Sequence, residues 1–130
     1  MFRRSTLIVL IALVGALALA ACGGGGDPTD PPAAARTLNI DATEFAFSPA
    51  DFSASVGEQL TFTIQNDGAL EHNFAILDAD GNDLARVEGI GVGESKSVSF
   101  TPSSAGALKL VCDIAGHEEA GMLGSLTVSE

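Results

Sequence analysis

Apolar and polar residues alternate with a period of two in several short segments, and this alternation is the main structural signal of the chain. The segments are residues 60–65, 74–76, 97–100, 108–112 and 126–128. In the first of them, Leu60, Phe62 and Ile64 alternate with threonine and glutamine. Successive side chains of a strand point to opposite faces, so this period predicts strands with one buried face. After residue 35 no segment shows a sustained helical stripe.

Turn-forming residues separate these segments at short intervals. They lie at residues 48–49, 56–58, 66–68, 80–82, 91–93 and 103–106. Glycine, proline, asparagine and aspartate favour the backbone geometry of tight turns. Seven or eight short strands punctuated this often predict an all-β fold, an antiparallel β-sandwich with Greek-key connections. Its core is expected to contain Phe45, Phe47, Phe52, Phe62, Phe74 and Phe100.

The N-terminal part of the chain has a different texture, which is typical of an export signal. Arg3 and Arg4 give positive charge, and an apolar or small-residue run extends over residues 7–21. Such a run is the pattern of a secretory signal, and it is short for a membrane-spanning helix, which needs about 20 apolar residues. It ends in Leu-Ala-Ala-Cys, residues 19–22, which resembles the lipobox of bacterial lipoproteins.

The lipobox resemblance implies that Cys22 is lipidated and becomes the mature N-terminus, so that a lipid anchors the protein to a membrane. The alternative is a plain signal peptide with a chance cysteine. We expect a signal peptide over 1–21, the lipid-attachment cysteine and a flexible Gly/Pro-rich linker over 22–35, and one folded domain over 36–130. The expected location is the outer face of the cytoplasmic membrane or the periplasmic side of an envelope membrane. Export by the general secretory or the twin-arginine route fits these residues.

Charge and length narrow the possible partners. The 130 residues include six Lys and Arg against 17 Asp and Glu, a net charge of −11. A length of this order suits one domain, which we expect to be monomeric. An acidic surface repels phosphate backbones, so nucleic-acid binding is not expected. It favours cations or a basic protein partner, although acidity can also serve solubility alone.

The candidate chemistry lies in two short patches. Beyond the lipobox cysteine and the initiator methionine, the chain contains one Cys, two His and one Met: Cys112, His72, His117 and Met122. A thiolate, two imidazoles and a thioether are the ligand set of a trigonal blue copper site with a weak axial sulfur. Soft sulfur suits the cuprous ion and nitrogen suits the cupric ion, so the mixed set serves both states. The sequence therefore predicts one mononuclear copper ion.

Each of these residues also has a simpler interpretation. A lone inward-facing cysteine is commonly a small buried hydrophobe, a lone methionine is commonly core, and a lone histidine is commonly structural. Zinc also binds Cys and His, but a thioether is an unusual zinc ligand and closed zinc sites favour more thiolates. A free thiol in an exported domain would be open to oxidation, which metal ligation prevents. The four residues together favour copper. The two histidines of the chain are too few for a multicopper enzyme.

The ligand loop carries a family resemblance. Cys112-x4-His117-x4-Met122, followed by Gly-Ser-Leu-Thr-Val from residue 124, closely resembles the loop of the small cupredoxins, the plastocyanin and azurin group. The likeness spans residues 38–129. It implies a Greek-key β-sandwich, one type 1 copper and electron transfer without substrate turnover. It also implies that Asn73, next to the first histidine, steadies the ligand loop through hydrogen bonds near the thiolate.

Two functions remain open from the sequence. The first is an electron carrier in which Glu118 and Glu119, directly after His117, form an acidic docking rim for a basic redox partner. The alternative for these residues is two solvated loop carboxylates. The second function is a copper-binding lipoprotein that stores copper or delivers it to an oxidase. A metal-free interaction module is disfavoured because all four candidate ligands are present.

Overall fold

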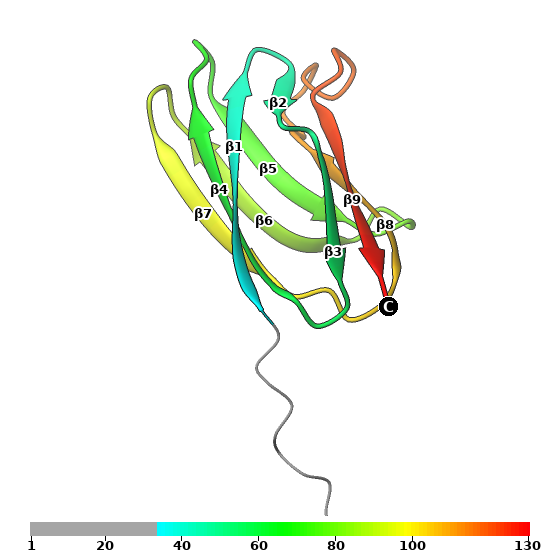
Figure 1. Ribbon diagram of the computed structural model, residues 1–130. Helices are drawn as coiled ribbons and strands as arrows, with labels where there is room; N and C mark the ends of the chain where they lie inside the picture. Colours follow the sequence, from blue (N-terminus) through cyan, green and yellow to red (C-terminus); the bar gives the residue numbers. More distant parts are fainter. Residues whose placement is uncertain (1–33) are drawn as a thin grey trace, which may run out of the picture.

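The computed structural model describes residues 34–130, which form a sandwich of two β-sheets (Figure 1). The strands are β1 (Ala35–Thr43), β2 (Ala46–Ser48), β3 (Asp51–Ser55), β4 (Gln59–Asn66), β5 (His72–Leu77), β6 (Asp83–Ile90), β7 (Ser95–Phe100), β8 (Gly106–Val111) and β9 (Leu123–Ser129). One sheet has the order β2-β1-β4-β7 and the other β3-β9-β8-β5-β6. The predicted all-β sandwich is confirmed. Within residues 34–130, no helix is long and apolar enough to span a membrane.

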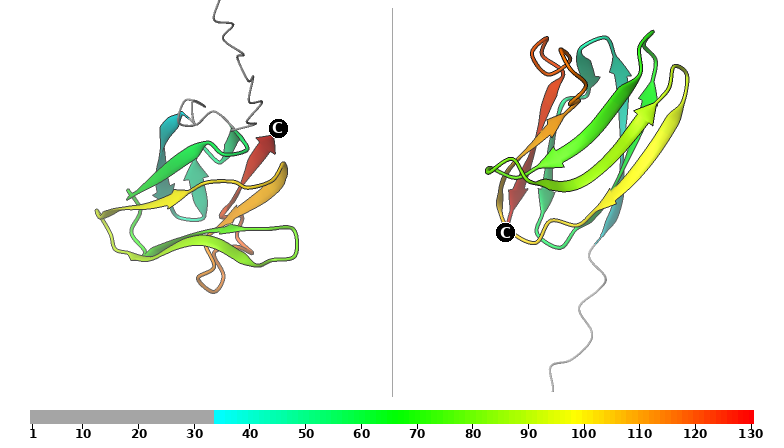
Figure 2. Two further views of the ribbon diagram at one scale, coloured as in Figure 1. Left: turned by 90° about the horizontal axis from the view of Figure 1, so that it is seen from below. Right: turned by 180° about the vertical axis from the view of Figure 1, so that it is seen from behind.

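The sheets are mixed rather than wholly antiparallel. The chain passes repeatedly from one layer to the other, as the two further views show (Figure 2). As a result β1 runs parallel to β4, with Ile40 opposite Ile64, and β3 runs parallel to β9. The period-two pattern indicates which face of a strand is buried but not the direction of its neighbour. The described residues also form nine strands instead of seven or eight, because β2 has only three residues and is too short to show a pattern.

Aromatic side chains form the centre of the core between the sheets. Phe47, Phe62 and Phe74 are buried, and the ring of Phe74 lies 5.3 Å from that of Phe62 and 5.6 Å from that of Phe47. Phe52 and Phe100 are partly buried and pack against this cluster. Five of the six phenylalanines predicted for the core therefore contribute to it, as expected from their places on inward strand faces.

Phe45 is the exception, and its prediction as a core residue was wrong. It lies in the turn between β1 and β2 with a φ of 62°, a left-handed conformation that few residues other than glycine adopt. This conformation takes the side chain out of the strand alternation and leaves it 39% exposed. Its ring instead contacts the ring of His117 edge-on, with 5.3 Å between the centroids.

A buried polar residue, Asn66, links the two sheets at one end of the sandwich. It is the last residue of β4, and its side-chain amide donates to the carbonyl of Ile90 in β6 at 2.8 Å. The same amide donates to the carbonyl of Leu70 at 2.7 Å, and its side-chain oxygen accepts from the N–H of Gly68 at 2.9 Å. These bonds satisfy the buried side chain and fix the loop that leads into β5.

The export signal over 1–21, lipidation of Cys22 and most of the linker over 22–35 lie outside the described residues. They stay predictions from the sequence. The first strand begins at Ala35, one residue before the predicted start of the folded domain.

Candidate metal centre

The candidate ligands lie together at one end of the five-stranded sheet. His72 is the first residue of β5, Cys112 directly follows β8, and Met122 directly precedes β9. These three strands are neighbours, in the order β9-β8-β5. Strand pairing therefore brings His72 beside Cys112, although 40 positions separate them in the sequence.

The loop from β8 to β9 is closed by its own backbone. The N–H of Cys112 donates to the carbonyl of Met122 at 3.2 Å, and the N–H of Met122 donates to the carbonyl of His117 at 3.0 Å. Gly116 turns the chain before His117 with a φ of 89°, which glycine adopts without strain. The three candidate ligand positions of the loop therefore converge instead of spreading along an extended segment.

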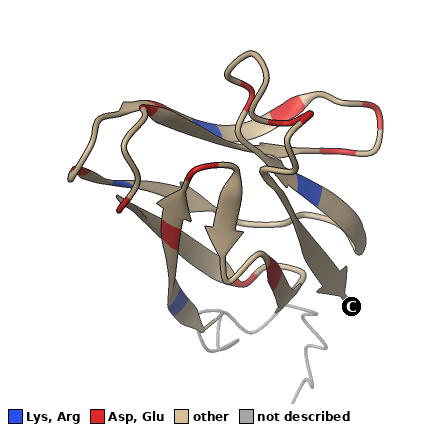
Figure 3. Cartoon of the chain, turned by 90° about the horizontal axis from the view of Figure 1, so that it is seen from above, with Lys and Arg blue, Asp and Glu red and all other residues tan. Residues whose placement is uncertain are grey.

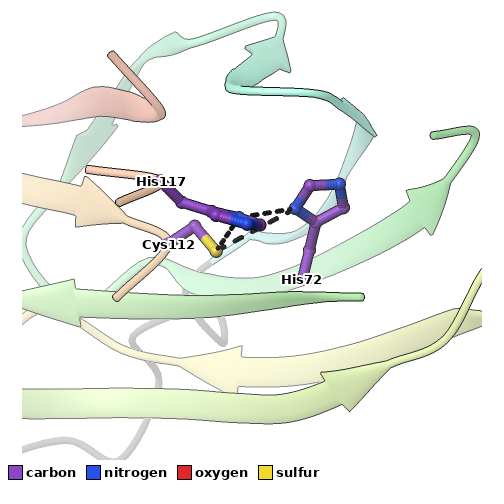
Figure 4. A group of neighbouring side chains, drawn as sticks. All are labelled: His72, Cys112 and His117. Atoms are coloured by element: carbon purple, nitrogen blue, oxygen red, sulfur yellow. Dashed lines mark hydrogen bonds between the residues drawn. The ribbon is translucent and has the colours of Figure 1, made fainter. Parts of the chain in front are cut away.

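Three donor atoms face one another in the interior (Figure 4). The Nδ1 atoms of His72 and His117 are 3.2 Å apart, and the Sγ of Cys112 lies 3.4 Å from Nδ1 of His117 and 4.0 Å from Nδ1 of His72. His72 and Cys112 are fully buried, and His117 is 6% exposed. Met122, five positions after His117 in the same loop, is fully buried, and its backbone is held by the bonds described above.

These separations fit one metal ion. An ion of the first transition row bonds imidazole nitrogen and thiolate sulfur at about 2.0–2.3 Å, so three such donors in a plane lie about 3.5–4.0 Å apart. The observed 3.2, 3.4 and 4.0 Å lie in or near that range. A thiolate and two imidazoles with a buried thioether nearby favour copper over zinc. The arrangement is that of a type 1 copper site.

The surroundings of His72 suit a neutral, metal-binding imidazole. Burial lowers the pKa of His72 below its ordinary value of 6.5, and His117 lowers it further against an opposing effect of Glu44. A neutral ring keeps a lone pair for a metal. Its Nε2 is buried and has no hydrogen-bond partner among residues 34–130. A Cβ at Gly68 would lie 3.2 Å from this Nε2, so glycine leaves the ring its space.

Asn73, the residue after His72, lies beside the sulfur of Cys112. Its backbone N–H donates to the Sγ of Cys112 at 3.3 Å. Its side-chain amide donates to Oδ1 of Asp113 at 2.9 Å, and its side-chain oxygen accepts from the N–H of Gly89 at 3.0 Å. Asn73 therefore ties the strand that begins with His72 to the strand that ends before Cys112.

Two charged residues near this asparagine were missed by the sequence analysis. Asp113 accepts from Nη1 of Arg86 at 2.6 Å. The bond from Asn73, and then that from Arg86, hold the pKa of Asp113 below its ordinary value of 3.8, so Asp113 is an anion at neutral pH. Asp113 is adjacent to Cys112 and could have been singled out. Arg86 lies 27 positions away, and only strand pairing brings it near.

The two glutamates predicted to form an acidic rim differ in their surroundings. The carboxylate of Glu118 forms an ion pair with Lys109 of β8, whereas Glu119 is exposed. Seen from this end of the sandwich, acidic residues also lie on other loops, while basic residues lie on strands (Figure 3). The acidic character of this end therefore does not depend on Glu118 and Glu119 alone.

Comparison with known proteins agrees with this geometry. CopI of Pseudomonas aeruginosa, named a copper-resistant cuproprotein, is 26% identical over 171 aligned positions, which cover 95% of this chain and 94% of that protein. Plastocyanin B′/B″ of Nicotiana tabacum is 34% identical over 100 positions, covering 71% of this chain and 96% of the relative. Among solved structures, reduced auracyanin of Roseiflexus castenholzii has a TM-score of 0.68 at 24% identity, over 75% of this chain and 99% of that one, and shares the fold.

The profile of the cupredoxin-like domain matches residues 7–128, which is most of the chain. With the plastocyanin relative, the β-sandwich and the convergent His, Cys and His donors, this match shows that the chain belongs to the cupredoxin-like family.

Proposed function

We propose that the protein is an extracytoplasmic electron carrier that binds one type 1 copper ion through His72, Cys112, His117 and Met122. The observation that carries this proposal is the convergence of two imidazole nitrogens and one thiolate within 4.8 Å in a buried site. When bound, copper supplies a one-electron couple between its cuprous and cupric states. The cupredoxin resemblance favours electron transfer without substrate turnover.

The residues around the site suit that task in two ways. The loop carrying Cys112 and Met122 is closed by backbone hydrogen bonds, which limits its rearrangement between oxidation states. Of the four proposed ligands, only His117 retains exposed surface, at 6%. We propose that its ring edge, beside the exposed ring of Phe45, is the point at which electrons leave the protein.

The visible spectrum of the copper-loaded chain tests this function. We expect an intense blue band that bleaches on reduction and returns on oxidation, because thiolate ligation to cupric ion produces it. Cys112→Ser should be colourless with cupric ion. Val111→Ala, a buried neighbour in the same segment that offers no donor atom, is the matched control and should stay blue. A colourless parent chain would refute the proposal.

A second candidate function is copper storage or delivery to an oxidase, favoured by the end-to-end similarity to a copper-resistant cuproprotein. The two functions differ in what happens on reduction. An electron carrier keeps its copper through repeated cycles, whereas a store releases it to an acceptor. Cycling the loaded chain in the presence of a cuprous chelator separates them. We expect retention, and loss of copper within the first cycles would favour storage.

The redox partner is proposed to be a protein with a basic docking surface. Phe45 and Leu70 are exposed apolar residues at the end of the sandwich that carries His117, and they are 39% and 45% exposed. Glu44 lies in the same turn as Phe45, and its carboxylate accepts from the backbone N–H groups of Ala69 and Leu70. An apolar centre with acidic surroundings suits a partner of opposite charge. We propose that the carrier acts as a monomer.

For the N-terminal part we propose export, a signal peptide over 1–21, and a lipid on Cys22 with residues 22–35 as a spacer before the domain over 36–130. The support is the lipobox resemblance of residues 19–22. Mass spectrometry of the mature protein from a bacterial envelope should find a lipidated N-terminal cysteine. Cys22→Ser should then abolish membrane attachment without changing the copper spectrum. A mature chain without lipid would refute the anchor.

A further inference from the structure

A chain of hydrogen bonds leads from the surface arginine of β6 to the sulfur of Cys112. We propose that Arg86 is a positioning residue for this thiolate, acting through Asp113 and Asn73. The inference rests on the proposed function, because it takes Cys112 as a copper ligand. It adds a residue of the neighbouring strand β6 to a site that the ligand loop and strand β5 otherwise define.

The inner part of this chain fixes the orientation of Asn73. Its backbone N–H points to Sγ of Cys112 at 3.3 Å. Its side chain is held from two sides, by Oδ1 of Asp113 at 2.9 Å and by the N–H of Gly89 at 3.0 Å. Bonds at both ends of the side-chain amide anchor Asn73 to the neighbouring segments, which holds its backbone in place relative to Cys112 and keeps the N–H directed at the sulfur. The arrangement requires Asp113 to keep one orientation.

Arg86 holds Asp113 in that orientation. Its Nη1 donates to Oδ2 of Asp113 at 2.6 Å, which leaves Oδ1 for Asn73. The guanidinium is itself held by Asp83, with bonds of 2.9 and 3.0 Å, and by Glu88 at 3.0 Å. A planar guanidinium can bind several carboxylates at once, which a lysine ammonium cannot do in the same geometry. The side chain of Arg86 is 29% exposed, so its bonds are only partly screened by solvent.

The charges of Asp113 and Arg86 also support a role for Arg86 at the site. Asp113 follows Cys112 directly, so an anion stands next to the thiolate. An uncompensated anion there would disfavour added negative charge at the site, and Arg86 offsets it. The hydrogen bond from Asn73 also stabilises electron density on the sulfur. Removing Arg86 should therefore weaken the hydrogen bond from the Asn73 N–H to the sulfur and shift the copper equilibrium towards the oxidised state.

Two readouts on the full chain test the inference. The first is hydrogen exchange of the Asn73 backbone N–H, measured by NMR in the diamagnetic cuprous form and in the copper-free chain. The second is the reduced-to-oxidised ratio against a one-electron mediator. We expect Arg86→Met to speed the exchange about fivefold. We also expect it to lower the ratio about threefold, which for one electron corresponds to about 28 mV.

Arg36→Met is the matched control. Arg36 also forms an ion pair, with Glu58 at 2.8 Å, and its loss changes the net charge equally. It lies near the start of β1, whereas the turn after β1 carries Phe45 beside His117. We expect neither readout to move in this variant. Equal changes in both variants would mean that overall charge is responsible, and would overturn the inference.

Arg86→Lys separates charge from geometry and serves if the Met variant does not fold. It keeps the positive charge but cannot hold Asp83 and Asp113 together, so Asn73 exchange should lie between the parent and the Met variant. Unchanged exchange of Asn73 in both Arg86 variants would overturn the inference. A parent chain without a blue band would instead refute the proposed function, and the exchange of Asn73 in the copper-free chain would still test the positioning.

Discussion

The two sheets of the sandwich contribute different things to the molecule. The four-stranded sheet presents a regular apolar face, and β4 alternates buried and more exposed residues along its length, with Leu60, Phe62 and Ile64 turned inward. The five-stranded sheet carries His72 at the start of β5 and the loop between β8 and β9. All four proposed ligands thus belong to one layer, so we expect that packing in the other layer can be altered without loss of copper binding.

The largest expected effect comes from removing a ligand from the five-stranded sheet. In His72→Leu the affinity for copper should fall at least about 100-fold, more than changes outside the ligand set produce, and the blue band should be lost. The copper-free chain should keep its free energy of unfolding within about 1 kcal/mol, because an apolar side chain replaces a buried imidazole whose Nε2 has no partner in the described part of the chain. Copper titration and urea unfolding check both parts. A large loss of stability would mean that His72 is structural.

In the four-stranded sheet we expect a large loss of stability without loss of copper binding. Phe62→Ala empties the centre of the core and should lower the free energy of unfolding by about 3–5 kcal/mol. The folded variant should still be blue with cupric ion, because no donor atom is removed. Phe100→Ala, at a partly buried position of the same sheet, is the control and should cost less. A folded but colourless Phe62 variant would contradict the separation of the two sheets.

Asn66 is where the two sheets are coupled, so its removal should affect both. Asn66→Ala loses the bonds to the carbonyls of Leu70 and Ile90 and should cost about 2 kcal/mol of stability. It should also broaden the NMR signals of His72, since the loop before β5 is released. Gln65→Ala, one position earlier on the other face of β4, should change stability by less than about 0.5 kcal/mol. Similar effects of both changes would argue against the link.

The pH dependence of the copper-free chain tests the burial of His72. The pKa of His72 is lowered on folding, so the unfolded chain binds the proton first as the pH falls. This contribution to stability is complete above pH 6.5 and is lost as the pH falls from there towards the lowered folded pKa. The slope from one proton is at most about 1.4 kcal/mol per pH unit. His72→Leu is the control and should lack this component in denaturant titrations.

The smallest expected effect is on the rate of electron transfer, when a charge is removed from the loop that carries His117. Glu119→Gln should lower the rate of electron transfer to a basic c-type cytochrome about twofold at low salt, and the difference should vanish at 1 M salt. Glu130→Gln removes the same charge at the C-terminus, at the opposite end of the sandwich (Figure 1). Stopped-flow rates should show no change for this control. Equal rates for both variants and the parent would contradict the docking role of Glu119.

The sequence was enough to name the candidate ligands, but it was not enough to name the residues around them. His72, Cys112, His117 and Met122 could be named because the chain beyond the lipobox holds no other Cys, His or Met. The intervals of five residues that separate Cys112, His117 and Met122 also fit a closed loop. Arg86 had no comparable signal, because its bond to Asp113 depends on which strands become neighbours.

For the fold too, local features could be predicted from the sequence, whereas features that depend on the path of the chain could not. Alternation in residues 60–65 predicted β4 and its buried face, since one-sided burial leaves a direct trace in the sequence. The parallel pairing of β1 with β4 leaves no such trace, because it depends on the path of the chain between the layers. Phe45 was misplaced for a local reason. Its left-handed backbone is a property of the turn, and hydrophobicity alone placed it in the core.

X-ray absorption at the copper edge of the loaded chain tests the central claim most directly, because it reports the atoms bonded to the metal. The predicted result is one copper per chain, bonded to two imidazole nitrogens and one thiolate sulfur, with the short copper–thiolate bond lost in Cys112→Ser. Copper surrounded only by nitrogen and oxygen, or a short copper–sulfur bond that persists in Cys112→Ser, would contradict the proposed centre.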